Sequence, residues 1–280
     1  FCSMTLLKRL LDFYINSSLH VALAVLSFCV LTTYELDLNS SIVLFSAVFC
    51  AAIVGYNFVK YFGLAKFYYR SLTTKLKYIQ LVSALSILGL GYAFLQLQST
   101  TQMLLFFLGL ITFFYAIPMG LKTPKNLRSI GGVKIYIIAF VWAMTTVALP
   151  ILESQLLLNF EHWILIVQHT FIIIVLMLPF EIRDIDLDQI YLSTIPQKIG
   201  VRNTKIIGYA LLGDALLLEF FKHQFDQNRF LIVVFLVVIL ILFLAKSTPK
   251  RSRYYTAFWV EAIPILTLGI LWIMVLIQKA

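Results

Sequence analysis

The chain has 280 residues, of which 61% are hydrophobic and 12% are charged, and its formal net charge is +9 at pH 7. No water-soluble domain of this length can bury so much apolar side chain, so the composition excludes the soluble protein classes. It predicts an all-α polytopic membrane protein.

Apolar windows long enough to cross roughly 30 Å of hydrocarbon as a helix, about 17 to 23 residues each, recur along the whole chain. They lie at about 18–35, 39–59, 78–96, 101–119, 131–152, 161–180, 205–221, 229–246 and 255–277. We therefore expect a bundle of nine transmembrane helices.

The distribution of Lys and Arg predicts which helix ends face the cytosol. Of 22 such residues, 19 lie in the N-terminal segment or after the second, fourth, sixth and eighth helices; the others are Lys222, Arg229 and Lys279. Cytosolic flanks of membrane helices are enriched in Lys and Arg. The N-terminus is therefore expected in the cytosol, and the positive charge indicates loops near anionic lipid rather than nucleic-acid binding.

The cysteines and histidines are few and dispersed. Cys2, Cys29 and Cys50 match neither a disulfide framework nor a metal knuckle, and the four histidines show no ligand spacing. Neither residue type indicates a functional site.

The most charged stretch follows the sixth apolar window, where EIRDIDLD, residues 181–188, holds five charged residues. If the sixth helix continues past Phe180, then Glu181, Asp184 and Asp188 fall at i, i+3 and i+7 and share one face. Carboxylates at this spacing repel one another, and the helix macrodipole also disfavours them at a C-terminus. A compensating positive charge is therefore expected.

Two sources of that positive charge stay open. Mg²⁺ takes one or two protein carboxylates and completes its coordination with water and phosphate oxygens, which makes Asp184 and Asp188 candidate metal ligands. Alternatively, the stretch is a solvated turn that ends the helix and pairs with Arg183 and nearby lysines. The DxxxD spacing fits both interpretations.

The wider run EIRDIDLDQIYLSTIPQKIG, residues 181–200, resembles the second aspartate motif of the UbiA-type intramembrane prenyltransferases. That motif is an RDxxxD segment followed by a TLP-like stretch and a glycine. Residues 113–150 also look like the family's fourth-helix exit, basic loop and fifth-helix entry. The resemblance implies one UbiA-like transmembrane domain over residues 1–280. The matching motif residues are Arg183, Asp184, Asp188, Thr194, Ile195, Pro196 and Gly200.

Members of this family transfer a polyprenyl group from its diphosphate to an acceptor, often an aromatic ring, with Mg²⁺ held between two aspartate motifs. The first motif, NDxxDxxxD, lies at the end of the second helix, where this chain reads NFVKYFGLA over residues 57–65. Asn57 matches, whereas Phe58, Tyr61 and Ala65 stand at the aspartate positions. The chain therefore departs from the family at its first motif.

A diphosphate needs positive charge around it, and side chains supply such charge as well as metal ions do. Lys60, inside the altered motif, is expected to stand in for one Mg²⁺ while Asp184 and Asp188 hold another. For any single loop cation, the alternative is that it sets topology and binds lipid headgroups. The residues expected to grip the diphosphate electrostatically are Asn57, Lys60, Lys122, Arg128, Lys134 and Arg183.

Two acidic residues lie about two helical turns inside their apolar windows, Asp214 in the seventh and Glu261 in the ninth. Carboxylates within a membrane are functional candidates by default. Together with Glu181, they form a set of candidate cavity acids. Three roles stay open for Asp214 and Glu261. Each is a candidate to pair with cations that line a cavity, to accept a proton from the substrate, or to form a hydrogen bond with a neighbouring helix.

Three functions remain open on these patterns. The leading one is a prenyltransferase-like protein of the bacterial cytoplasmic membrane, which binds an isoprenoid diphosphate through Mg²⁺ and transfers the prenyl group to a small acceptor such as an aromatic ring. Loss of the first-motif aspartates favours the second, a non-catalytic UbiA-like protein that binds an isoprenoid lipid or acts as a scaffold. A transporter ranks third, because only Asp214 and Glu261 favour it and no internal repeat is present.

Overall fold

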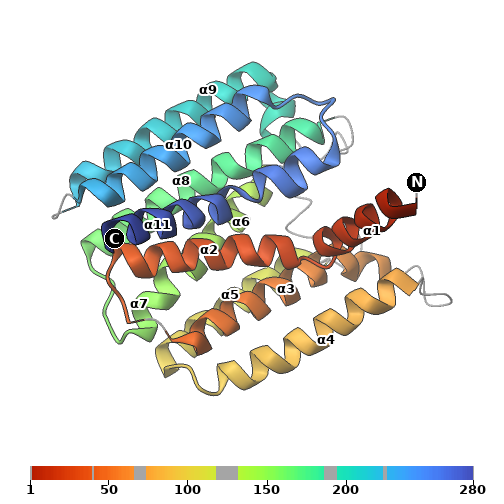
Figure 1. Ribbon diagram of the computed structural model, residues 1–280, viewed down its shortest axis with the longest axis horizontal. Helices are drawn as coiled ribbons and strands as arrows, with labels where there is room; N and C mark the ends of the chain where they lie inside the picture. The colour runs from red at the N-terminus through yellow and green to blue at the C-terminus, as the bar shows by residue number, and fades with distance from the viewer. Residues whose placement is uncertain are drawn as a thin grey trace, which may run out of the picture.

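The computed structural model describes residues 2–39, 41–65, 74–117, 132–185, 194–222 and 226–279, and its regular elements there are helices (Figure 1). In chain order they are α1 (Cys2–Asn16), α2 (Leu19–Glu35), α3 (Ile42–Ala65), α4 (Thr74–Phe94), α5 (Ser99–Ala116), α6 (Val133–Ala143), the π-helix η2 (Met144–Ala148), α7 (Leu149–Glu153), α8 (Phe160–Arg183), α9 (Ile195–Leu217), the 3₁₀-helix η4 (Leu218–Phe221), α10 (Gln227–Lys246), the π-helix η5 (Tyr255–Val260) and α11 (Ile263–Lys279).

The helices form a polytopic membrane bundle. Among the described residues, seven helical spans are long and apolar enough to cross a membrane, and counting α1 and α2 as one span bent by 56° gives an eighth. Each of the nine expected segments falls on a helix, but α9, which begins IPQKIGVRNTK, is not among these spans. Nine crossings and a cytosolic N-terminus therefore stay predictions.

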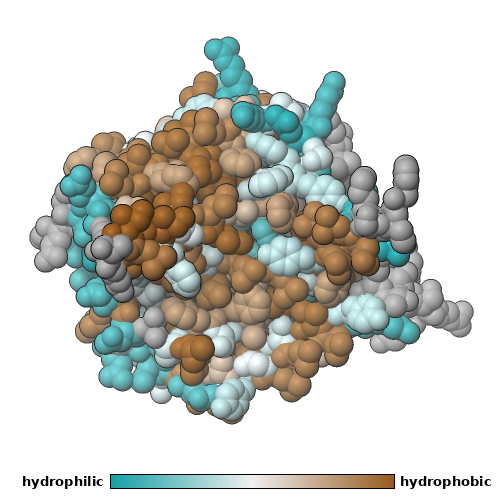
Figure 2. Space-filling model, viewed as in Figure 1, coloured by the Kyte–Doolittle hydropathy of each residue, from teal (hydrophilic) through white to brown (hydrophobic). Residues whose placement is uncertain are grey.

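The centre of the bundle is formed by α8 and by the continuous span α6–η2–α7. In each of these spans 67% of the apolar window is buried, against 17% for α4 and α5 at the periphery. Helix α2 packs against α3 on one side and α11 on the other, which joins the two groups of helices seen in Figure 1. Figure 2 shows an apolar band across the middle of one face, with hydrophilic residues toward its edges.

A proline interrupts the last span close to a charged residue. Pro264 lacks the N–H that would bond to the carbonyl of Val260, so the regular helical ladder cannot run through this point. The π-helix η5 ends at Val260, and α11 begins at Ile263, one residue before Pro264. Glu261 lies in this break.

The N-terminal helix α1 was not expected from the sequence. It meets α2 at an elbow formed by Ser17 and Ser18, and Ser18 has the left-handed backbone conformation with φ 63°. Both serine residues are fully buried. The elbow brings α1 over the ends of other helices, where it contributes to the site.

Candidate functional site

One end of the bundle, which we call the α1 end, gathers most of the polar residues that the sequence analysis identified. Helices α3 and α8 finish there, while α2 and η5 start there (Figure 1). Because alternate helices of an up-and-down bundle end on the same side, segments 120 residues apart in sequence meet at this end. The sequence analysis predicts that this is the cytosolic end.

Asn57 of α3 fixes the elbow between α1 and α2. Its side-chain amide donates to the carbonyl of Ser17 at 3.1 Å and to Oγ of Ser83 at 2.9 Å, and its Oδ1 accepts from Oγ of Ser18 at 2.8 Å. The residue is 4% exposed. Both amide protons therefore have partners, and Asn57 holds three helices together instead of presenting a free donor to a ligand.

Lys60 lies one turn further along α3 and is exposed. Its Nζ donates to Oγ of Ser18 at 2.9 Å and to the carbonyl of Ile15 at 3.4 Å, and it lies 5.8 Å from the centre of the Tyr56 ring. The elbow thus orients the ammonium group, and the exposed side chain keeps it accessible.

Arg183, the last residue of α8, holds the carboxylate of Asp184 in a bidentate pair. Nε and Nη2 of Arg183 each donate to one carboxylate oxygen at 2.6 Å. Its Nη1 donates to Oγ1 of Thr256 in η5, and the guanidinium lies 5.6 Å from the Phe180 ring. This planar fork is the geometry in which arginine best matches a carboxylate or a phosphate.

Glu261 is half-buried, and the positive charges that act on it are those of Lys60, Arg183 and Arg253. Arg253 is exposed and donates to Oδ1 of Asn16 in α1. Three cations from α3, α8 and the segment before η5 therefore act electrostatically on one carboxylate. We call Lys60, Arg183, Asp184, Arg253 and Glu261 the open cluster.

Aromatic hydroxyl groups lie beside the open cluster. The hydroxyl of Tyr56 accepts a hydrogen bond from Nε1 of Trp142 at 2.7 Å. The charge of Glu261 acts on both Tyr56 and Tyr14. Tyr254 donates to Asp12 of α1 at 2.6 Å, which raises the pKa of Tyr254. The site therefore combines cations, acids and ring faces at one end of an apolar bundle.

Comparison with known proteins identifies the fold. No protein-family model and no curated protein matches the sequence. A UbiA homologue from Archaeoglobus fulgidus, bound to GPP and Mg²⁺, matches with a TM-score of 0.64 over 92% of this chain and 97% of that chain at 9% identity. The chain has the UbiA fold.

Two further structures agree. An apo UbiA homologue from Aeropyrum pernix K1 matches with a TM-score of 0.60, 12% identity and coverage of 92% of this chain and 98% of that chain. A digeranylgeranylglyceryl phosphate synthase matches with a TM-score of 0.56, 13% identity and coverage of 94% and 95%. The resemblance read from the second aspartate motif is thus confirmed at the level of fold.

Within this UbiA fold, three further predicted site residues are described: Glu181, Asp214 and Lys134. Glu181 is 3% exposed, and its carboxylate accepts the backbone N–H of Ile195 at 3.4 Å, at the start of α9. Asp214 is exposed near the end of α9, next to Ala215, whose carbonyl accepts from Gln168 at the opposite end of the bundle. Lys134 is half-buried near the start of α6. The remaining predicted residues, Asp188, Lys122 and Arg128, lie outside the described residues.

Of the expected stripe of three carboxylates, the structure describes Glu181 and Asp184, and these two face different partners; Asp188 lies outside the described residues. Helix α8 ends at Arg183, and Asp184 is its C-cap with non-helical angles of φ −89° and ψ 7°. Glu181 is turned toward α9, whereas Asp184 is turned toward Arg183. Repulsion between carboxylates at a helix C-terminus is thus relieved by separation and by a neighbouring guanidinium.

The UbiA resemblance implies Mg²⁺, and the described residues do not fit this ion. Both oxygens of Asp184 accept hydrogen bonds from Arg183, and the three α3 positions where the family motif has aspartates carry Phe58, Tyr61 and Ala65. In the described part of the chain, no three His, Cys, Asp or Glu residues lie close enough to hold a metal. A magnesium ion needs oxygen ligands in an octahedral arrangement, and a cationic surrounding opposes its binding.

Sequence reasoning missed Arg253, Thr256 and the contribution of α1. A signal for Arg253 was present, because SRYY, residues 252–255, directly precedes the apolar window that contains Glu261. The elbow had no such signal, since Ser17 and Ser18 are ordinary interhelical residues until Asn57 is known to bond to them.

A second polar cluster lies at the opposite end of the bundle. Nζ of Lys222 donates to Glu35 at 2.5 Å, to Glu219 at 2.7 Å and to Oε1 of Gln168 at 3.0 Å, and Gln168 donates to Glu219 at 2.6 Å. Burial lowers the pKa of Lys222, but Glu35 and Glu219 more than offset this and hold it above its ordinary value. We call these four residues the closed cluster.

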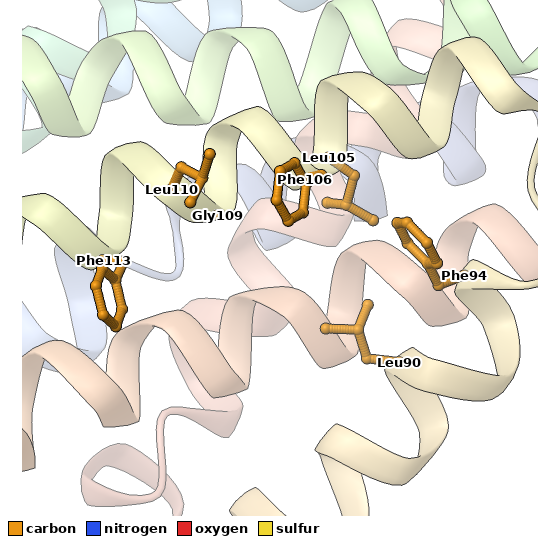
Figure 3. A pocket seen from close by; sticks show the side chains of 7 residues that line it. All are labelled: Leu90, Phe94, Leu105, Phe106, Gly109, Leu110 and Phe113. Atoms are coloured by element: carbon orange, nitrogen blue, oxygen red, sulfur yellow. The ribbon is translucent and has the colours of Figure 1, made fainter.

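A third feature is an apolar pocket of about 380 Å³ between α4 and α5 (Figure 3). Its lining is almost wholly hydrocarbon, and Phe113 at one end stacks on Phe58 of α3 at 5.8 Å. Such a surface suits a hydrocarbon chain and not a charged group. The lining residues are Leu90, Phe94, Leu105, Phe106, Gly109, Leu110 and Phe113.

Proposed function

We propose that the chain is an integral-membrane prenyltransferase that binds an isoprenoid diphosphate at the open cluster and transfers the prenyl group to a small acceptor such as an aromatic ring. The observation that supports this proposal is that Lys60, Arg183 and Arg253 lie at the α1 end of a UbiA fold and all act electrostatically on Glu261. A UbiA homologue of this fold is bound to GPP and Mg²⁺. The bacterial cytoplasmic membrane stays the predicted location.

The reaction would use the cluster in two ways. The bond between the first prenyl carbon and the diphosphate oxygen breaks, its electron pair leaves with the diphosphate, and the cations stabilise that charge. A bond then forms from the acceptor carbon to the prenyl carbon, and the acceptor proton passes to a carboxylate. Glu261 lies among the cations at the site and is the proposed proton acceptor.

A second candidate is a non-catalytic protein of the same fold that binds an isoprenoid lipid or acts as a scaffold. It is favoured by the replacement of the first-motif aspartates with Phe58, Tyr61 and Ala65. In this case the cations at the α1 end would hold a lipid diphosphate without cleaving it.

Binding and transfer assays on the protein purified in detergent separate these functions. Isotope-labelled GPP is incubated with the protein, Mg²⁺ and a panel of aromatic acceptors, and bound label and prenylated product are both measured. Product that disappears in Glu261→Gln while GPP binding persists supports the transferase. Binding with no product supports the non-catalytic candidate, and no binding of GPP refutes both assignments of the site.

A further inference from the structure

We propose that the open cluster binds the diphosphate directly through Lys60, Arg183 and Arg253 and requires no divalent cation. This inference rests on the proposed function, because it concerns how the same site recognises its ligand. It departs from the magnesium dependence that the sequence resemblance implies.

The first argument is the charge of the cluster. The open cluster contains three cations, Lys60, Arg183 and Arg253, and two carboxylates: Asp184, which pairs with Arg183, and Glu261, on which all three cations act electrostatically. With all five groups ionised, three positive and two negative charges leave an excess of one positive charge. A site that recruits Mg²⁺ needs an excess of carboxylate, so this balance favours an anion instead.

The second argument is the occupation of Asp184. Its two oxygens receive 2.6 Å hydrogen bonds from Arg183, and its side chain is 23% exposed. A metal ion would have to compete with a guanidinium fork for the same oxygens. Phosphate oxygens present the same bidentate geometry as a carboxylate, so a diphosphate can exchange with Asp184 as the partner of Arg183.

The third argument is the availability of Lys60 and Arg253. Both side chains are exposed, and each is held by an uncharged oxygen of the α1 segment or the elbow: Lys60 by Ser18 and Arg253 by Asn16. Such contacts orient a cation without neutralising it. Lys60 also donates to the carbonyl of Ile15, the residue next to Asn16, so both cations are held by the same short stretch at the elbow.

The test is calorimetric titration of GPP into the full chain in detergent, once with Mg²⁺ and once with EDTA. We expect the two affinities to agree within about threefold, because side-chain cations supply the charge. A loss of about thirtyfold or more in EDTA would overturn the metal-free site while leaving the proposed function intact. Absence of binding in both conditions would refute the proposed function itself.

Variants identify the groups that bind. In EDTA, Lys60→Ala and Arg253→Ala should each weaken GPP binding by about tenfold or more, the effect of losing one charge-assisted hydrogen bond. Lys250→Ala, at an exposed position before η5, is the matched control and should leave binding unchanged. Equal effects of Lys250→Ala and Arg253→Ala would refute the site, since general loop charge would then explain binding.

Asp184→Asn distinguishes the two kinds of site most sharply. If Asp184 only partners Arg183, neutralising it should preserve or strengthen GPP binding in EDTA. If Asp184 is a metal ligand, the same change should abolish binding that depends on Mg²⁺.

Competition by inorganic pyrophosphate, which carries no prenyl tail, tests the role of the cations. Pyrophosphate should compete with GPP in EDTA, and failure to compete would show that the tail and not the cations drives binding. The melting temperature of each variant reports that it is folded.

Discussion

The open and closed clusters contain similar groups and differ in how completely these groups are paired. In the closed cluster, Lys222 contacts three oxygens within 3.0 Å, and its side chain and those of Glu35 and Glu219 are 14%, 16% and 7% exposed. In the open cluster, Lys60 and Arg253 are exposed and are held by neutral oxygens. Full pairing indicates a structural clamp, whereas oriented but unneutralised charge indicates a binding site.

The position of each cluster supports this difference. The closed cluster joins the end of α2 to α8 and to the turn after α9, about 25 Å along α2 from the elbow at a rise of 1.5 Å per residue. It fixes the far end of the bundle. Changes in the closed cluster should therefore alter stability, and changes in the open cluster should alter ligand binding.

The largest effect on stability is expected for Lys222→Met. Removing this cation leaves Glu35 and Glu219 buried without a charged partner, which should lower the free energy of unfolding by about 3–5 kcal/mol. Thermal melting in detergent measures the loss, and Lys222→Arg, which keeps the charge, is the control. A melting temperature equal to that of the parent chain would show that the clamp contributes nothing. GPP affinity of the folded fraction should not change.

Asn57→Ala should produce the next largest effect, and it tests whether this residue belongs to the scaffold or to the ligand site. The change removes two hydrogen bonds to the elbow and one to Ser83 of α4, for an expected loss of about 2–4 kcal/mol in the free energy of unfolding. Ser83→Ala removes one of the three and should cost about 1 kcal/mol. If Asn57→Ala instead melts normally but fails to bind GPP, the sequence interpretation of Asn57 as a diphosphate ligand is correct.

The sequence predicted the helices well because membrane crossing imposes one strong rule, a long apolar window. All nine windows fall on helices of the structure. Helix α1 was not predicted by this rule because its sequence LLKRLLDFYI mixes charged and apolar residues and because the helix is shorter than a membrane span. The fold class was therefore predictable, whereas the helix that completes the site was not.

The site was predictable only where one segment carries its own signal. Arg183 and Asp184 stand in a motif, and Lys60 stands in the altered copy of another, so all three were identified. Asp214 and Glu261 looked alike in sequence, but one is exposed on α9 and the other lies in the break before Pro264. Which acid faces the cations depends on helix rotation and on a proline break, and hydropathy encodes neither.

The smallest effect is expected for Arg229→Ala, which tests whether charge outside the two clusters matters. Arg229 pairs with Asp226 at 3.7 Å, and the two side chains are 34% and 41% exposed. Exposed pairs of this length contribute about 0–1 kcal/mol, so the melting temperature should hardly change.

The effect of the ion pair can be separated from that of the helix cap. Asp226 also caps α10 by accepting the backbone N–H groups of Asn228 and Arg229 at 2.8 and 3.0 Å. Arg229→Ala keeps that cap, whereas Asp226→Ala removes it and should cost about 0.5–2 kcal/mol. Thermal melting of both variants measures the pair and the cap separately. A loss of melting temperature for Arg229→Ala as large as that for Lys222→Met would mean that charges in general stabilise this end of the bundle. The distinction between the closed cluster and ordinary surface charge would then be wrong.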